Sequence, residues 1–129
     1  MKELAFRLLK GDDLKECIQE KCKEINTAIV LSSVGCVDKV SLRLAGAKKN
    51  LTSNKDYEIL SLNGTISNGK AHLHICLSDD EGNCIGGHLL KGTIVNTTCE
   101  VVLGILEEYD SKRTFDEKTG YDEISFIRK

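Results

Sequence analysis

The 129-residue chain contains no proline and no tryptophan, and it has no long apolar run. No segment approaches the roughly 18 consecutive apolar residues that a membrane-spanning helix needs. The opening stretch Met1–Leu9 is short and interrupted by Arg7, so we expect no secretory signal here and a cytoplasmic location. The six cysteines are then expected to be reduced, and none of them forms a C-x-x-C motif of the kind found in zinc knuckles or thioredoxin-like proteins.

Charge of either sign is nearly balanced. The chain has 18 Lys and Arg against 20 Asp and Glu, a net charge of −2. Domains built mainly to hold a phosphate backbone are usually basic, so this balance argues against such a role, although it leaves room for a local basic patch. No glycine-rich phosphate loop or nucleophile elbow is present. The length and the hydrophobic content of 40% are typical of a globular chain forming a single domain over residues 1–129.

Hydrophobic patterning predicts one helix and many strands. Asp13 followed by Glu16 fits a capping box, and apolar residues recur at helical spacing from Leu14 to Ile25. Hairpins dominate the middle of the chain, which favours an α+β (α/β) fold: a mainly antiparallel β-sheet of about seven or eight strands packed with one main helix. We expect a polar loop over 46–56, a turn over 116–120, and strands over 3–9, 28–37, 40–44, 57–67, 71–78, 84–90, 99–106 and 123–127.

All three histidines, His72, His74 and His88, lie within 17 positions. His72 and His74 alternate in a predicted strand, so their imidazoles project from the same face. If residues 79–83 form a five-residue loop, counting inward places His88 directly opposite His74. A four-residue loop would instead turn His88 to the other face. Gly86 and Gly87 precede His88, and glycines inside a strand indicate a bulge or a close approach of another backbone.

The preceding hairpin provides a second view of the same face. With Asn68-Gly69 as its two-residue turn, Thr65 lies opposite His72, Asn63 opposite His74 and Ser61 opposite Cys76. The histidine face is therefore polar, and Ser61, Asn63 and Thr65 are candidates for hydrogen bonds to the imidazoles in the second shell of a metal site. The core face is expected to hold Leu60, Leu62, Ile66, Leu73 and Ile75.

Three converging imidazoles are a ligand set for zinc first, with copper, nickel or iron as alternatives. Three protein ligands leave a fourth position for water or substrate, as in catalytic zinc sites. The competing interpretation is that the histidines are half-exposed strand and turn residues without a ligand. Cys76 shares their face and is a candidate fourth ligand, but a small buried side chain is the preferred interpretation. Glu58 falls on the other face unless Gly64 marks a bulge, so a solvated or ion-paired role is preferred for it.

The ordered motifs E-I-L-S-L-x-G-T-I from Glu58 to Ile66, H-x-H, and G-G-H ending at His88 resemble the plant and prokaryote conserved (PPC) domain of the stand-alone prokaryotic type. Arg7, Gly11-Asp12-Asp13 and the segment 99–102 fit as well, so the likeness runs from about residue 4 to residue 126. The resemblance implies a homotrimer with sites near subunit contacts and metal ligation by the three histidines. The fold is also similar to that of acetolactate decarboxylase, a zinc enzyme with histidine ligands.

These observations predict a cytoplasmic, trimeric metal-binding protein. Its open coordination position would bind or transform a small oxygen-containing molecule, with enzyme activity left open. The alternative is a DNA-binding, transcription-associated regulatory protein. Plant relatives join this domain to an AT-hook, whose Pro-flanked Arg-Gly-Arg core is absent here, so DNA is the less favoured partner. A third interpretation is a plain interaction scaffold. No membrane partner is expected.

Overall fold

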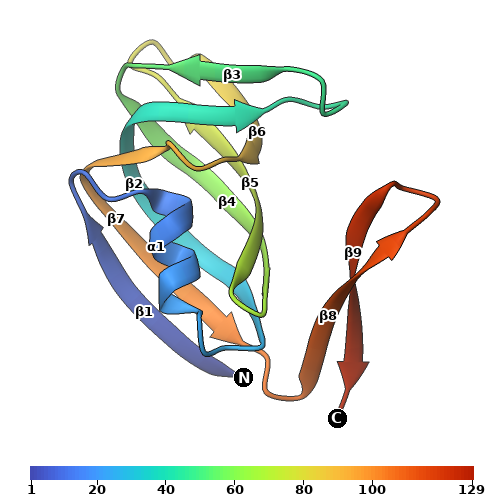
Figure 1. The fold of residues 1–129 in the computed structure, drawn as a ribbon. Coiled ribbons are helices and arrows are strands. Elements are labelled where there is room, and N and C mark those ends of the chain that lie inside the picture. Colours follow the sequence, from blue (N-terminus) through green and yellow to red (C-terminus); the bar gives the residue numbers. More distant parts are fainter.

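A computed structural model describes residues 1–129 as nine strands and one eight-residue helix (Figure 1). The elements in chain order are β1 (Lys2–Leu9), α1 (Leu14–Lys21), β2 (Thr27–Arg43), β3 (Asn50–Ser53), β4 (Tyr57–Ser67), β5 (Lys70–Ser78), β6 (Cys84–Leu89), β7 (Ile94–Ile105), β8 (Tyr109–Asp116) and β9 (Tyr121–Arg128). The α+β class is appropriate, although strands dominate more than the sequence predicted. The helix is far too short to span a membrane.

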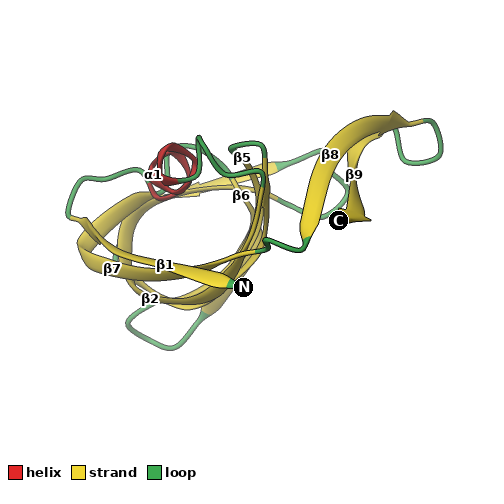
Figure 2. Cartoon of the chain, turned by 90° about the horizontal axis from the view of Figure 1, so that it is seen from below, coloured by secondary structure: helices red, strands yellow, loops and turns green.

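Seven strands form one antiparallel sheet that closes on itself. Six strands follow the order β1-β7-β2-β4-β5-β6, and β3 pairs with β2 outside this path. Strand β6 returns to pair with the far end of β2, so β2, β4, β5 and β6 make a ring. The 17-residue β2 makes this possible because it pairs with β7 and β4 along its first part and with β6 and β3 at its end. Seen end-on, the strands surround a common interior with α1 along one side (Figure 2).

The helix covers this interior with one apolar stripe. Leu14, Ile18 and Cys22 are completely buried and belong to a cluster of 20 buried residues. The cap is the predicted one, since the Asp13 carboxylate accepts a hydrogen bond from the Glu16 amide at 3.0 Å. The helix nevertheless ends at Lys21, short of the predicted Ile25, which packs against the core from beyond the helix.

Several predicted boundaries are corrected by pairing between distant segments. The two strands expected at 28–37 and 40–44 are one strand, because β2 continues through its bulges to reach new partners. The expected loop at 46–56 contains β3, which pairs with β2. Strand β7 starts at Ile94 rather than at 99, and β8 was not predicted. In each case a neighbouring strand supplies hydrogen bonds that the local pattern does not reveal.

A bulge at Leu60 changes which side chains face outward. Ile59 pairs with Leu77 and Ser61 pairs with Cys76, so Leu60 is one extra residue in β4. Leu60 is 55% exposed, and its predicted place in the core is wrong. The bulge also brings Glu58 opposite Ser78, onto the face that carries the histidines. The bulge that does this lies at Leu60 and not at Gly64, where the sequence had suggested one.

Strands β8 and β9 form a separate two-stranded sheet, here called the arm, which projects from the closed sheet (Figures 1 and 2). Ser111 anchors its base, because the buried Ser111 hydroxyl lies 2.8 Å from the hydroxyls of both Thr27 and Ser67. The arm exposes large apolar side chains, with Phe115 and Tyr121 near its turn and Phe126 and Ile127 at its base.

Candidate metal centre

The turn at residues 79–83 determines where His88 points. Oδ1 of Asp79 accepts hydrogen bonds from the backbone amides of Glu81 and Asn83, both at 2.9 Å, and the Asp79 amide donates to the Asn83 carbonyl at 2.9 Å. Lys55 donates to Oδ2 of Asp79 at 2.9 Å. That hydrogen bond, with the two amides, lowers the pKa of Asp79 to about 2. The turn therefore holds five residues, as predicted.

Both predicted registers are confirmed. Ser78 pairs with Cys84 and His74 with His88 across β5 and β6. Thr65 pairs with His72 and Asn63 with His74 across β4 and β5. The intervening side chain of Leu73 is completely buried on the opposite face. The buried face fixes the register, because a slip of one residue would expose the whole apolar set.

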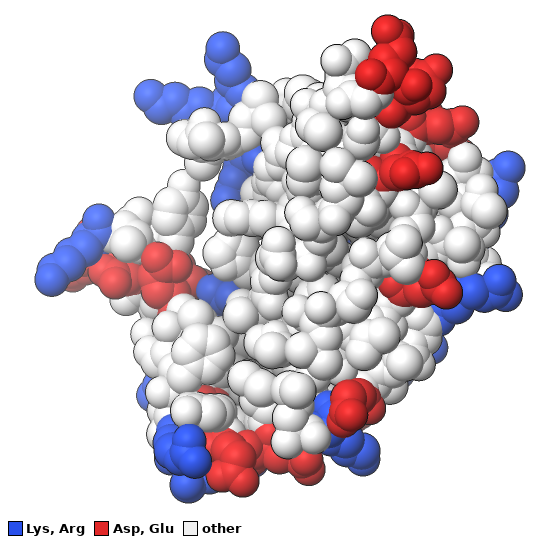
Figure 3. All heavy atoms as spheres, turned by 180° about the vertical axis from the view of Figure 1, so that it is seen from behind, with Lys and Arg blue, Asp and Glu red and all other residues white.

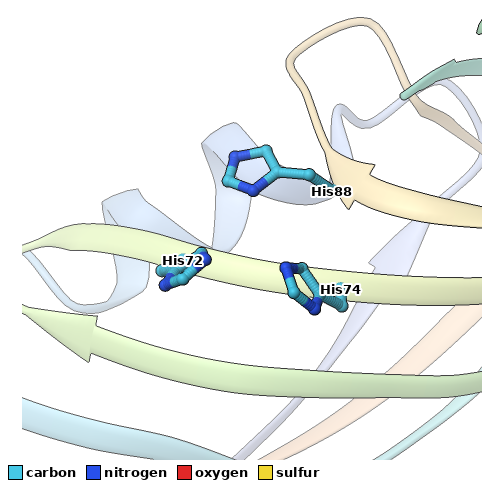
Figure 4. Close-up of side chains that lie close together, drawn as sticks. All are labelled: His72, His74 and His88. Atoms are coloured by element: carbon cyan, nitrogen blue, oxygen red, sulfur yellow. The ribbon is translucent and has the colours of Figure 1, made fainter. Parts of the chain in front are cut away.

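The three imidazoles converge on one point (Figure 4). The centroid of the His72 ring lies 5.2 Å from that of His74 and 5.2 Å from that of His88, and the His74 and His88 centroids are 5.8 Å apart. One nitrogen from each ring lies within 4.8 Å of the other two. Zinc–nitrogen bonds of 2.0–2.1 Å in a tetrahedron require nitrogens about 3.3 Å apart, which small side-chain rotations can reach. The donor set therefore fits a divalent transition metal.

Two of the histidines have lowered pKa values. Partial burial is the main cause of the low pKa of His72, followed by the charges of His74 and Arg113. Partial burial, followed by the charge of Arg43, lowers the pKa of His88 to about 4. Both imidazoles are consequently neutral at neutral pH, which is the form that binds a metal ion.

The two glycines before His88 lie where backbones pass closely. A Cβ at Gly86 would lie 2.7 Å from the carbonyl oxygen of Ile75, and one at Gly87 would lie 2.8 Å from that of Arg43. Both distances are shorter than a side chain tolerates, so any larger residue would push β6 away from β5 or β2. These glycines allow His88 to lie between its two neighbouring strands.

The other residues predicted around the site form no hydrogen bond with the imidazoles. Asn63 and Thr65 line a hollow beside His72 and His74, but neither donates a hydrogen bond to an imidazole. Ser61 lies further along β4, opposite Cys76. Cys76 is outside the histidine group, and Glu58 lies at the far end of the face, opposite Ser78. The second-shell roles of Ser61, Asn63 and Thr65 stay predictions.

The structure adds residues that sequence reasoning missed. Arg43, at the end of β2, pairs with His88, and its Nη2 lies 3.5 Å from Nδ1 of that ring. The guanidinium carbon also lies 5.9 Å from the centre of the Tyr121 ring on the arm. Arg43 and Tyr121 join the histidines around a cavity of about 620 Å³, closed on another side by the loop at 44–47. No local signal pointed to them, because the arm and the β2–β6 pairing are both long-range features.

A second hollow, of about 420 Å³, adjoins the first and shares Arg43, His72, His88 and Tyr121 with it. Its other walls come from the start of β5 and from the arm: Lys70, Ala71, Arg113, Asp122 and Glu123. The histidine cluster therefore lies between the closed sheet and the arm, and both contribute charged groups to its surroundings.

The sequence model of the Plants and Prokaryotes Conserved (PCC) domain matches residues 1–107 of this chain. The arm lies beyond that match. The bifunctional protein GlmU of Synechococcus sp. (strain JA-3-3Ab) is 37% identical over 121 residues, which make up 92% of this chain and 20% of that protein. The chain thus spans about a fifth of the length of the curated relatives it matches.

Solved structures share the whole fold. A hypothetical protein from Salmonella cholerae-suis is 31% identical with a TM-score of 0.94, covering 98% of this chain and 94% of that one. A metal-containing protein from Archaeoglobus fulgidus is 31% identical with a TM-score of 0.82, over 95% and 92% of the two chains. A candidate DNA-binding protein from Bacteroides thetaiotaomicron is 25% identical with a TM-score of 0.84, over 96% and 91%.

Proposed function

The chain belongs to the plants and prokaryotes conserved domain family, and from that premise we propose that it is a metal-binding member. His72, His74 and His88 would hold a zinc-like divalent ion, and the adjoining cavity would receive a small oxygen-containing molecule. The observation that carries this proposal is the convergence of three imidazoles from two strands, two of them with lowered pKa values. A similar protein described as metal-containing, from Archaeoglobus fulgidus, agrees with it.

The chain's own residues divide the work at this site. The three imidazoles would supply nitrogen ligands, and Gly86 and Gly87 let β6 approach closely enough for His88 to join the pair on β5. A bound ion would supply Lewis-acid chemistry, by polarising a carbonyl or acidifying a water. The cavity beside the cluster has room for a ligand, since small-molecule sites typically measure about 300–1,000 Å³.

We further propose that copies of the chain associate, as trimers by the family resemblance, in the cytoplasm. Large apolar side chains are exposed on the outside of the closed sheet, with Leu31 at 44%, Val34 at 54% and Leu60 at 55%. Phe115 and Phe126 are exposed on one face of the arm. Contiguous exposed apolar residues mark contact surfaces in soluble proteins. The arm's anchor at Ser111 supports treating residues 1–129 as one working domain.

Elemental analysis tests the metal proposal directly. Protein purified without added metal should contain about one equivalent of zinc or a similar ion per chain, and His74→Ala should lose most of it. Ser78→Ala is the matched control, because Ser78 lies on the same strand and face but away from the cluster. Absence of metal from all three samples, also after incubation with zinc, would end the proposal. Trimers that form without metal and are indifferent to chelator would then favour the interaction scaffold.

DNA binding is the second candidate, because a similar protein from Bacteroides thetaiotaomicron is described as a candidate DNA-binding protein. One face of the molecule offers no continuous basic track for a duplex, because it shows a mostly uncharged centre with groups of both signs around its rim (Figure 3). A duplex held through phosphates would bind with an affinity that falls steeply as salt rises. A flat titration with duplex DNA at low salt would remove this candidate.

A further inference from the structure

Three cationic side chains surround the histidine cluster without a carboxylate partner. The structure contains four ion pairs, Lys23–Glu20, Lys55–Asp79, Arg128–Glu108 and Lys129–Asp110. None of them involves Arg43, Lys70 or Arg113, which all line the hollow between the closed sheet and the arm. Positive charge is thus gathered at the site and left unpaired within the chain.

Arg113 shows this most clearly. Its Nη1 donates to the carbonyl oxygen of Asp122 at 3.2 Å, but its Nη2 is buried and has no hydrogen-bond partner. A buried donor without an acceptor is unfavourable, and more so when the group carries a charge. Arg113 is one of the residues that line the same hollow as His72 and His88. If its guanidinium turns toward that hollow, a ligand there would supply the missing acceptor.

Arg43 provides a second charge from the other wall. It is the only Lys, Arg, Asp or Glu around the larger cavity, whose lining holds no carboxylate. Its contacts inside the chain are a long approach to His88 and a stacking position near Tyr121, neither of which neutralises a guanidinium. The cavity therefore presents a positive wall directly beside the three imidazoles.

Two acidic side chains reduce this positive charge only in part. Asp122 and Glu123 line the smaller hollow, and neither lies within ion-pair distance of Arg113. Asp122 is exposed, whereas Glu123 is half-buried. Three cations against two acids leave the neighbourhood of the histidines positive, before any metal adds its own charge.

We propose that the ligand of this site is a small anion bearing a carboxylate or phosphate group, which Arg113 and Arg43 hold while its other end faces the histidines. This rests on the proposed function for the role of the metal, but the arginine contacts stand without it. The planar guanidinium presents paired N–H donors that match two oxygens of either anion. Arg113 would bind from the arm and Arg43 from β2, so the arm is part of the binding site.

Isothermal titration of the full-length protein with inorganic phosphate and with pyruvate tests this in metal-free and zinc-loaded samples. At least one probe should bind, and the probe that binds identifies the anion as phosphate or carboxylate. Arg113→Met and Arg43→Met should each weaken binding about 10-fold or more, since each removes charged hydrogen bonds. Lys112→Met is the matched control, because Lys112 is exposed on the opposite face of the same strand and loses the same charge. Its affinity should stay within about twofold.

The outcomes separate the two proposals. Binding lost in the arginine variants without any zinc uptake supports the anion site and overturns the metal site. Zinc uptake with equal anion affinity in Arg113→Met, Arg43→Met and Lys112→Met overturns the anion site alone, as does failure of both probes to bind. Should Arg113→Met unfold, Arg113→Lys keeps the charge but loses the planar fork, and its affinity should fall between those of the wild type and the Arg43→Met variant.

Discussion

Two hairpins in this protein share a local plan and differ in everything that surrounds them. The β5–β6 hairpin carries the histidines, and the β8–β9 arm carries Arg113 and Tyr121. Each turn begins with an aspartate whose carboxylate accepts a backbone amide two residues on, from Glu81 in one and from Lys118 in the other. The same turn chemistry therefore reverses the chain in both places.

The two hairpins differ in how deeply their side chains are buried. On β5 the side chains of Leu73 and Leu77 are completely buried, whereas Phe115 and Phe126 on the arm are 64% and 47% exposed. A buried face specifies one register and holds it, while a two-stranded sheet without a core is marginally stable by itself. The closed sheet therefore holds the three histidines rigidly, whereas the arm can bring charged groups that adjust to a ligand.

The two hairpins should differ most in what a truncated apolar side chain does to stability. Leu73→Ala should lower the free energy of unfolding by about 2–5 kcal/mol, because it leaves a cavity directly beneath the histidines. Ile127→Ala on the half-exposed outer side of the arm should cost less than about 0.5 kcal/mol. Urea unfolding of both variants measures the difference. Equal losses would contradict the view that the exposed apolar side chains of the arm contribute little to the stability of the fold.

The exposed aromatic residues of the arm should matter for contacts between copies of the chain rather than for folding. Phe126→Ser should weaken self-association by about 10-fold or more, because aromatic residues dominate contact energies. Ile127→Ser, on the other face of the arm, is the control and should leave association unchanged. Sedimentation at several protein concentrations gives both values. Identical behaviour of the two variants would place the contact between copies elsewhere, for example at Leu31 and Val34.

The smallest expected effect concerns pH and the two turns. The pKa of Asp79 is about 2 in the folded chain against an ordinary 3.8, so its ionised form stabilises the fold above pH 3.8. That contribution is lost as the pH falls from 3.8 through about 2. Asp79→Asn keeps an acceptor for the amides of the turn but loses the ion pair with Lys55, so its melting temperature should fall less steeply over this range.

Melting curves of metal-free protein between pH 2 and pH 5 provide the measurement for that prediction. Asp116→Asn is the matched variant in the arm, because Asp116 opens the other turn and forms no ion pair. Its curve should follow the wild type. A wild-type slope in Asp79→Asn as well would show that other groups control acid stability.

The histidine cluster could be predicted from sequence because the positions of its members depend on two short turns. Counting from Asn68-Gly69 and from the loop at 79–83 fixed the partners of His72, His74 and His88, and the structure confirms those pairings. The same counting failed at Leu60, where a bulge that no sequence signal marked moved one residue outward. A few neighbouring residues determine the conformation of a turn, whereas a bulge depends on how two whole strands pair along their length.

By itself the sequence determined the alternation of apolar and polar residues on β4 and β5, the capped helix and the turns, and hence the face on which three imidazoles meet. Only the tertiary structure decided that β2 bends back to pair with β6, which carries Arg43 to His88, and that the arm stands beside the cluster with Arg113 and Tyr121. The reason is physical. The alternation of apolar and polar residues and the conformation of a turn depend on a few neighbouring residues. The pairing of segments 45 or more positions apart depends on the closing of the whole sheet.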